Sequence, residues 1–272
     1  MERQRHVYLA MKGLTEAQEI FSGLWQGKKT APEEIRVEDS LGRVTSRPVF
    51  AAISAPTYHC AAMDGIAVRA EETYGTTEKT PKHLTIGRDA AWINTGQALP
   101  EGYNAVIMIE KVHQLDDERL EILSPAYPWQ NIRKVGEDIV ATQLLLPQNH
   151  VIRPYDMGAL VSAGVFRVAV WKKPRVAIIP TGTELVRWAD IEDPRLLQKN
   201  QIIESNSILL AGLVVEAHGD PVVSDIVPDR EEAIRDALLR AARSDADLVL
   251  INAGSSAGSR DYTADIIAEI GE

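Results

Sequence analysis

The residues best suited to bind a ligand lie in a loop at residues 252–261, with the sequence NAGSSAGSRD. Two glycines and three serines let this backbone curl and present several N–H and O–H donors. A helix is expected to follow, and its N-terminal end would add a positive partial charge that attracts anions. The loop therefore predicts a phosphate site. The alternative is a plain strand-to-helix turn, which glycine-rich segments also form.

Two acidic residues extend this hypothesis. Asp261 closes the loop at the expected start of the helix, where it could cap the helix or bind Mg²⁺ through its oxygens. Glu184 closes a second loop at residues 181–184, with the sequence TGTE. Gly182 in that loop permits close approach of a ligand, and Glu184 could bind a metal ion or accept a hydrogen bond from a substrate. The alternative is a capped helix start with Glu184 in its first turn.

Two further acidic residues lie in turns nearer the N-terminus. Asp64 belongs to a Met-Asp-Gly sequence, and Asp138 to a Gly-Glu-Asp sequence. Asp and Gly favour turns, so each segment taken alone predicts a structural turn. His59 beside Cys60 does not predict a zinc site, because a second pair of ligands is missing.

The elements that must position these residues differ along the chain. A helix is expected from residue 15. Between residues 44 and 146 short apolar stretches alternate with Gly, Pro and Asn, which is typical of a small β-rich domain. A second helix is expected at residues 153–162, because Pro154 suits its first turn and Gly164 suits the position just past its end.

Strands and helices alternate after residue 174. A buried strand is expected at residues 176–179, a second strand starts at residues 222–223, and a third is expected at residues 248–251. Helices are expected at residues 207–217 and 262–270, and another follows a cap formed by Asp229 with Glu232. Such alternation predicts a parallel sheet with right-handed crossovers. Ligands bind outside the carboxyl ends of the strands in these sheets, which is where the loops 181–184 and 252–261 begin.

The composition narrows the functional class. The chain has 272 residues and a formal net charge of -10, which argues against sequence-independent binding of nucleic acid. A phosphorylated ligand would need local N–H donors or a cation to attract it. The sequence has no apolar run of about 18 residues, so no membrane-spanning helix is expected. The single cysteine, Cys60, can form no internal disulfide, and the cytoplasm is the simplest compartment.

Several motifs occur in a specific order. They are AMDGIAVR at 62–69, INTGQALP at 93–100 followed by EGYNAVI at 101–107, GED at 136–138, PRVA at 174–177 leading to TGTEL at 181–185, SN at 205–206, and the loop 254–261 followed by YT. In this order they resemble the molybdopterin molybdenumtransferases, a family that includes the E domain of gephyrin. The resemblance covers nearly the whole chain.

The resemblance implies a reaction and a set of site residues. The family binds adenylylated molybdopterin and molybdate, cleaves the adenylate, inserts molybdenum into the dithiolene and releases AMP, with Mg²⁺ assisting. Its catalytic positions correspond to Asp64, Thr95, Asp138, Glu184 and Asp261, of which Glu184 and Asp261 are the expected Mg²⁺ ligands. Its ligand-binding positions correspond to Thr181, Gly182, Ser205, Asn206, Gly254, Ser255, Ser256 and Gly258.

The resemblance also implies a multidomain α/β fold. A β-rich domain of residues 52–144 would be inserted in a helical linker domain of residues 1–51 and 145–174. Residues 175–272 would form an incomplete MogA-like three-layer α/β domain with a mostly parallel sheet. The family forms homodimers with sites shared across subunits, so that Asp64, Thr95 and Asp138 would act opposite Glu184 and Asp261 of the other subunit. A molybdopterin adenylyltransferase could be a partner.

The chain departs from the family pattern at several points. Ala253 stands where a glycine is usual, Asn104 where an aspartate is usual, and Ile66 where tyrosine is frequent. The family continues with further strands, lysine-containing segments and a β-rich C-terminal domain. We therefore expect an N-terminal part of a longer enzyme, inactive when isolated. The alternatives are a non-catalytic molybdopterin-binding scaffold or sensor, and a nucleotide-processing hydrolase, which the motifs of the β-rich domain disfavour.

Overall fold

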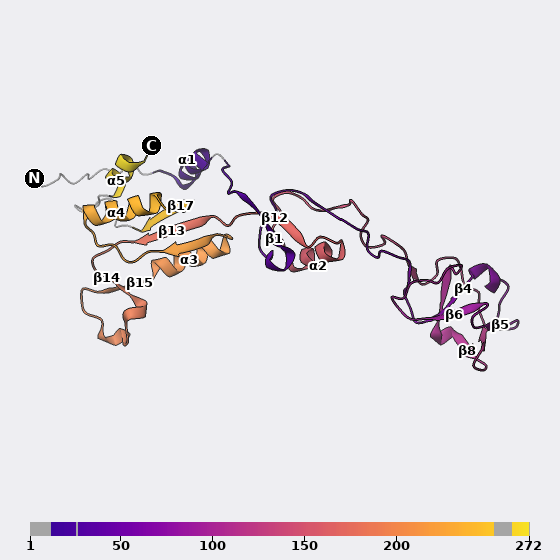
Figure 1. Ribbon diagram of the computed structural model, residues 1–272. Coiled ribbons are helices and arrows are strands. Elements are labelled where there is room, and N and C mark those ends of the chain that lie inside the picture. The colour runs from indigo at the N-terminus through magenta and orange to yellow at the C-terminus, as the bar shows by residue number, and fades with distance from the viewer. Residues whose placement is uncertain (1–11, 26, 253–262, 272) are drawn as a thin grey trace, which may run out of the picture. The chain divides into compact units, whose positions relative to one another are not determined.

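The computed structural model describes residues 12–25, 27–252 and 263–271. These residues divide into two compact units, shown in Figure 1, one within 1–33 and 170–272 and the other within 34–169. The finer division into three domains stays a prediction. None of the described helices is long and apolar enough to cross a membrane.

A three-stranded sheet forms the centre of the first unit. Its strands are β16 (Asp220–Val223), β13 (Arg175–Pro180) and β17 (Leu248–Asn252), in that spatial order. Both outer strands run parallel to β13. The strands expected at residues 176–179 and 248–251 are confirmed, and β16 begins two residues before the expected position. Val176, Ile178 and Ile179 are all buried, as a strand covered on both faces requires.

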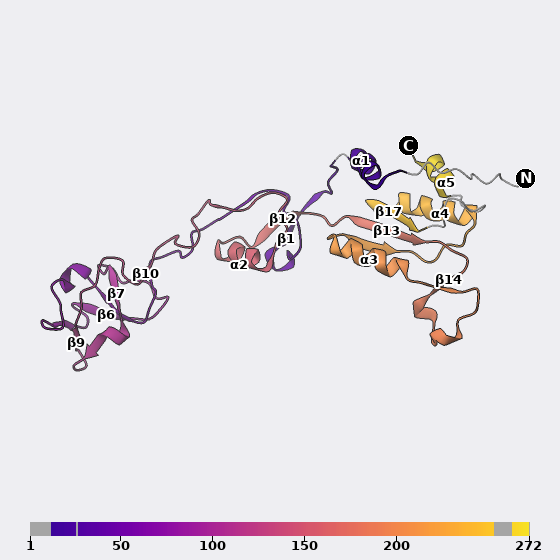
Figure 2. The ribbon, with the colours of Figure 1, turned by 180° about the vertical axis from the view of Figure 1, so that it is seen from behind.

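Helices cover both faces of this sheet. They are α3 (Asn206–Glu216), α4 (Glu231–Ala242) and α5 (Thr263–Ile270). Val176 and Ile178 pack with Val214 of α3, whereas Ile179 packs with residues of α4 and α5. Alternate residues of a strand point to opposite faces, so the apolar run of β13 serves two cores. Figure 2 shows α3 on one side of the sheet and α4 and α5 on the other.

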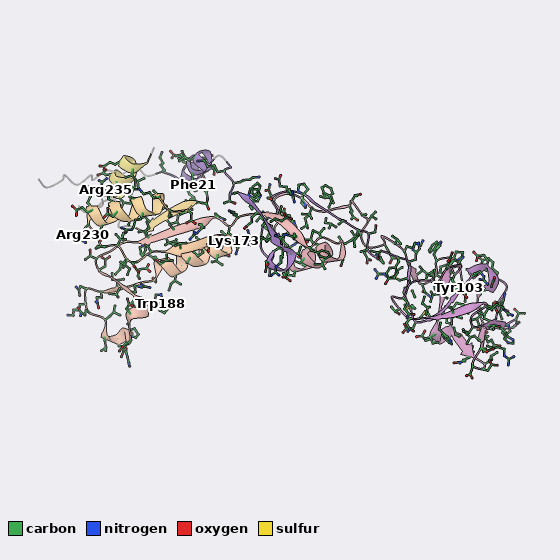
Figure 3. All side chains as sticks on the ribbon, in the orientation of Figure 1. Phe21, Tyr103, Lys173, Trp188, Arg230 and Arg235 are labelled. Atoms are coloured by element: carbon green, nitrogen blue, oxygen red, sulfur yellow. The ribbon has the colours of Figure 1, made fainter. Side chains whose placement is uncertain are left out.

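Two further segments belong to the first unit. α1 (Leu14–Trp25) begins one residue before the expected position, and its side chains at residues 14–24 are exposed. Between β13 and α3 the chain forms β14 (Leu185–Arg187) and β15 (Ile202–Glu204), which pair in parallel. The short 3-10 helices η4 (Trp188–Asp190) and η5 (Pro194–Leu196) connect them. Figure 3 shows Trp188 on this connection.

The second unit is rich in antiparallel strands. One sheet has the order β6 (Ala90–Ile93), β4 (Gly65–Val68), β7 (Ala105–Met108), and another has β5 (Lys82–Thr85), β9 (Arg119–Ile122), β8 (Val112–Gln114). The side chains of both sheets share one buried cluster, which includes Ile66, Leu84 and Leu120. Near it lie the 3-10 helices η2 (Ala70–Thr73) and η3 (Ile109–Lys111). The expected β-rich texture is thus confirmed.

Short strand pairs carry the chain between these sheets and the rest of the protein. They are β1 (Pro32–Arg36) with β12 (Arg167–Trp171), β2 (Val49–Phe50) with β11 (Leu144–Leu146), and β3 (Cys60–Ala61) with β10 (Ile132–Arg133). The remaining elements are η1 (Val37–Asp39) and α2 (Pro154–Ser162). The helix expected at residues 153–162 is confirmed. Gly164 follows it at φ +76°, where a Cβ would lie 2.9 Å from Cγ1 of Ile53.

Asp156 stabilises the start of α2. Its carboxylate accepts hydrogen bonds from the N–H of Arg153 at 2.9 Å and from Nε2 of His150 at 2.7 Å. Desolvation raises the pKa of this buried carboxyl, but the hydrogen bonds from His150 and Arg153 outweigh it and lower the pKa from 3.8 to about 2. The ionised form is therefore bound more tightly in the folded protein than in the unfolded chain.

We expect this carboxylate to make the stability depend on pH between about 4 and 2. Because the folded pKa lies below the unfolded one, the contribution is complete above pH 4 and is lost as the pH falls toward 2, amounting to about 2 kcal/mol. Urea unfolding of the wild type and of Asp156→Asn should therefore converge in acid. Asp89, whose pKa is also about 2, is present in both proteins and cancels. A constant difference at every pH would contradict the assignment.

Candidate functional site

Two loops that are far apart in the sequence begin side by side at the carboxyl edge of the parallel sheet. Thr181, which follows β13, donates from its N–H at 3.0 Å and from Oγ1 at 2.8 Å to the carbonyl of Asn252 at the end of β17. Thr181 is 7% exposed, so both bonds are shielded from water. The rule that ligands bind at this edge therefore directs attention to one shared place.

Gly182 makes the turn that leads away from β13. Its φ is +155°, and a Cβ here would lie 2.7 Å from Cγ of Leu185, so a side chain fits only if the turn moves. Its N–H donates to the carbonyl of Val227 at 3.0 Å, which joins the turn to the segment after β16. The chain then enters β14. The alternative of a capped helix start at Glu184 is therefore wrong, because the turn runs into a strand.

Glu184 presents an exposed carboxylate on a fixed backbone. Its carbonyl accepts the N–H of Ile202 at 2.9 Å, within the pairing of β14 and β15. Exposure and a fixed main chain leave the carboxylate able to meet a cation or a hydrogen-bond donor of a ligand.

The structure brings Asp229 to the same edge, which sequence reasoning missed. Its N–H donates to Oγ1 of Thr183 at 3.2 Å. The expected cap of α4 by Asp229 is wrong. Arg230, which is labelled in Figure 3, occupies the cap position and makes no side-chain cap bond. Asp229 follows β16, so the rule that singled out the loops after β13 and β17 would have found it if applied to all three strands.

Ser205 and Asn206 lie at the start of α3, and both are exposed. Ser205 holds the cap position without a side-chain cap bond. The buried carboxylate of Glu204 instead accepts the N–H of Ser207 at 2.9 Å. Glu204 therefore satisfies the helix start, and Ser205 and Asn206 are not needed for it.

Asp64 and Thr95 form a contact in the second unit, although 31 residues separate them. Oδ1 of Asp64 accepts the N–H of Thr95 at 2.7 Å, and the pKa of Asp64 is lowered first by this bond and then by the Thr95 side chain. The next residue has no room for a side chain, because a Cβ at Gly65 would lie 1.9 Å from the carbonyl oxygen of Ile107 in the neighbouring strand β7. Both Asp64 and Thr95 are exposed.

Asp138 lies on a neighbouring segment of the same unit. β3 pairs with β10, and on its other side the N–H of Ala61 donates to the carbonyl of Gln97. The carboxylate of Asp138 forms an ion pair with Arg133 of β10, and its N–H donates to Ala55. Asp64, Thr95 and Asp138 thus stand on segments that are hydrogen-bonded to residues 55–64. Asp138 is paired with Arg133 rather than with Asp64 or Thr95.

Five residues named by the sequence lie outside the described residues: Gly254, Ser255, Ser256, Gly258 and Asp261. In the part of the chain that is described, no three His, Cys, Asp or Glu side chains gather into a group that could hold a metal ion.

Two family models together match most of the chain. Residues 12–164 match the MoeA N-terminal region, domains I and II, and residues 177–272 match a probable molybdopterin binding domain. The chain belongs to the MoeA family. The resemblance drawn from the ordered motifs is thereby confirmed.

Relatives and a solved structure agree with this placement in the MoeA family. A putative molybdopterin biosynthesis protein of Methanocaldococcus jannaschii is 34% identical over 88% of this chain and 62% of its own length. A molybdopterin molybdenumtransferase of Haemophilus influenzae is 28% identical over 89% of this chain and 61% of its own. The crystal structure of a Pyrococcus horikoshii molybdopterin biosynthesis MoeA protein superposes with a TM-score of 0.77 at 28% identity, covering 93% of this chain and 66% of that one. The chain thus spans about three fifths of the curated relatives it matches.

We expect Gly182→Ala to lower stability, because the new Cβ contacts Leu185 and the backbone adopts a φ that alanine disfavours. A loss on the order of 1–3 kcal/mol is expected. Gly212→Ala is the matched control. Gly212 lies inside α3, and a Cβ added there would have no neighbour within 4 Å, so alanine should raise stability by about 0.5–1 kcal/mol. Equal and small shifts in the two variants would show that the 182 turn imposes no steric demand.

Proposed function

We propose that this protein acts in the insertion of molybdenum into molybdopterin, binding adenylylated molybdopterin and molybdate and releasing AMP. The observation that carries the proposal is the junction of Thr181 with Asn252, which starts two candidate ligand loops at one edge of a parallel sheet. Membership of the MoeA family and the match of residues 177–272 to a probable molybdopterin binding domain support it. We propose the whole reaction, and we assign to this chain the residues that are named below.

Each group has a part that its chemistry suits. The loop that holds Gly254, Ser255, Ser256 and Gly258 would bind a phosphate through N–H and O–H donors. Thr181 and Gly182 would let the ligand approach the backbone closely. Ser205 and Asn206 would contribute polar contacts to the ligand. Asp64, Thr95 and Asp138 would orient the amino groups of the pterin by accepting hydrogen bonds.

A Mg²⁺ ion is part of the proposal. The carboxylates at this edge fit it, because Mg²⁺ takes oxygen ligands and uses one or two carboxylates together with substrate phosphates. Glu184 is exposed, and Asp229 lies beside the neighbouring Thr183. Glu184 and Asp261 would hold the ion, which when bound neutralises the charge of the diphosphate.

A homodimer is the proposed assembly, because the candidate residues fall in two separate units of the chain. Asp64, Thr95 and Asp138 belong to one unit, and Thr181 and Glu184 to the other. Sites completed by a second subunit would use both sets. A molybdopterin adenylyltransferase is the proposed supplier of the adenylylated substrate.

The dimer predicts a mass in solution of about twice the 29.9 kDa of one chain. Sedimentation equilibrium at micromolar concentration, at low and at physiological salt, measures it directly. A monomer under both conditions would contradict sites shared between subunits.

Glu184→Gln tests the reaction. Glutamine keeps the size and the hydrogen-bonding oxygen but removes the charge that a cation needs, so AMP release with molybdate and Mg²⁺ should fall by about 100-fold or more, while pterin binding changes little. The measurement is AMP release from adenylylated molybdopterin by the full-length enzyme, since this chain is expected to be inactive when isolated, with thermal melting as the control for folding. Turnover of the variant equal to that of the wild type would remove Glu184 from the mechanism.

A further inference from the structure

Trp129 holds a backbone conformation that bulky residues rarely adopt. Its φ is +68°, in a turn held by its N–H, which donates to the carbonyl of Asn104 at 2.7 Å. Asn131 in the same turn also has a positive φ, but asparagine tolerates it far better than tryptophan. Glycine would adopt this conformation without strain. The turn therefore keeps an indole side chain where the backbone alone would favour a smaller residue.

Burial does not explain the tryptophan. Its side chain remains 42% exposed, so a large part of its apolar surface gains nothing from folding. The ring of His59 meets it edge-on, with centroids 4.9 Å apart and planes at 63°. The ammonium of Lys134 lies 5.1 Å from the centroid of the indole ring. A strained, exposed aromatic ring beside a cation is a combination that points to ligand binding rather than to packing.

The same side chains are fixed to the turns that carry the candidate site residues. Nδ1 of His59 accepts the N–H of Val135 at 3.1 Å, three residues before Asp138. The carbonyl of His59 accepts the N–H of Leu99 at 2.9 Å, and the hydroxyl of Tyr58 donates to the carbonyl of Gly96, next to Thr95, at 3.2 Å. His59, Trp129 and Lys134, called here the indole platform, thus adjoin the proposed substrate side of the second unit.

We propose that the indole platform binds the planar heteroaromatic ring of an anionic ligand, which rests on the proposed function for the identity of that ligand. Trp129 supplies the stacking face once the ammonium of Lys134, which lies over the ring, moves aside to meet a phosphate or carboxylate of the ligand. A local cation is needed because the chain as a whole carries a charge of -10. Aromatic stacking recognises any flat ring, so the pterin and the adenine of the adenylylated substrate share the required chemistry.

Calorimetric titration of the full chain with two separate probes tests the platform. Pterin-6-carboxylate presents the pterin ring with an anion, and AMP presents adenine with a phosphate. Binding of the first assigns the platform to the pterin, and binding of the second assigns it to the adenine. Loss of stacking in Trp129→Gly should weaken binding of the recognised probe about tenfold or more. Lys134→Met should weaken it too, and should reduce its dependence on salt.

Two controls separate binding from folding. Trp129→Gly removes the strain of the positive φ, so its melting temperature should not fall below that of the wild type by more than a few degrees. Trp92→Phe changes another exposed tryptophan of the same unit, 44% exposed on β6, and should bind as the wild type does. A structural Trp129 would give the reverse: a large drop in melting temperature with unchanged binding.

Probe binding tests the indole platform separately from the proposed reaction, which is tested by AMP release. Failure of the wild type to bind either probe, or equal binding by wild type, Trp129→Gly and Lys134→Met, would overturn the platform even if AMP release occurs. Binding that depends on Trp129 and Lys134 supports it even if AMP release is absent, because binding by the platform does not require turnover.

Discussion

The hydrogen bonds from Thr181 to the carbonyl of Asn252 are the constraint on which the candidate site of the first unit depends. They extend the parallel pairing of β13 and β17 by one residue beyond the last paired strand residues, Pro180 and Asn252. Because the two strands end together, the two loops after them must start together. Gly182 then turns the chain toward Val227, which brings in the segment after β16 as well. Three loops from distant parts of the sequence are thereby gathered by main-chain bonds, to which the hydroxyl groups of Thr181 and Thr183 add one bond each.

Much of this unit could be predicted from the sequence, for a physical reason. Strands buried on both faces must be almost wholly apolar, so the run at residues 176–179 is recognisable. β14 and β15 lack that signal, since their residues are half-buried or exposed apart from Glu204. The cap of α4 was wrong because the helix begins one residue later than that cap requires, with Arg230 at the cap position. The N–H of Asp229 bonds to the distant Thr183, and such a contact leaves no trace in local spacing.

The second unit shows where residue patterns stop being informative. Asp64 taken alone predicts only a turn, and that turn exists, but its partner Thr95 is 31 residues away. Only the resemblance to a family linked the two. The resemblance did not indicate that Asp138 pairs with Arg133, five residues earlier, nor that Trp129 has a positive φ in a turn held by the distant Asn104. Antiparallel units built from short strands depend heavily on contacts of this long-range kind.

Charge constrains how the candidate residues of both units could meet an anionic ligand. Glu184, Asp64 and Asp138 are exposed carboxylates on a chain of net charge -10, and the proposed ligand is an anion. A negative net charge repels an anionic ligand, but salt screens this repulsion beyond a distance of about 8–10 Å. Attraction must therefore come from groups close to the site. Arg133 partly neutralises Asp138, and Lys134 follows it in the chain. In the proposed function, cations placed beside the acidic turns would let the carboxylates select the amino groups of the ligand without driving its phosphate away.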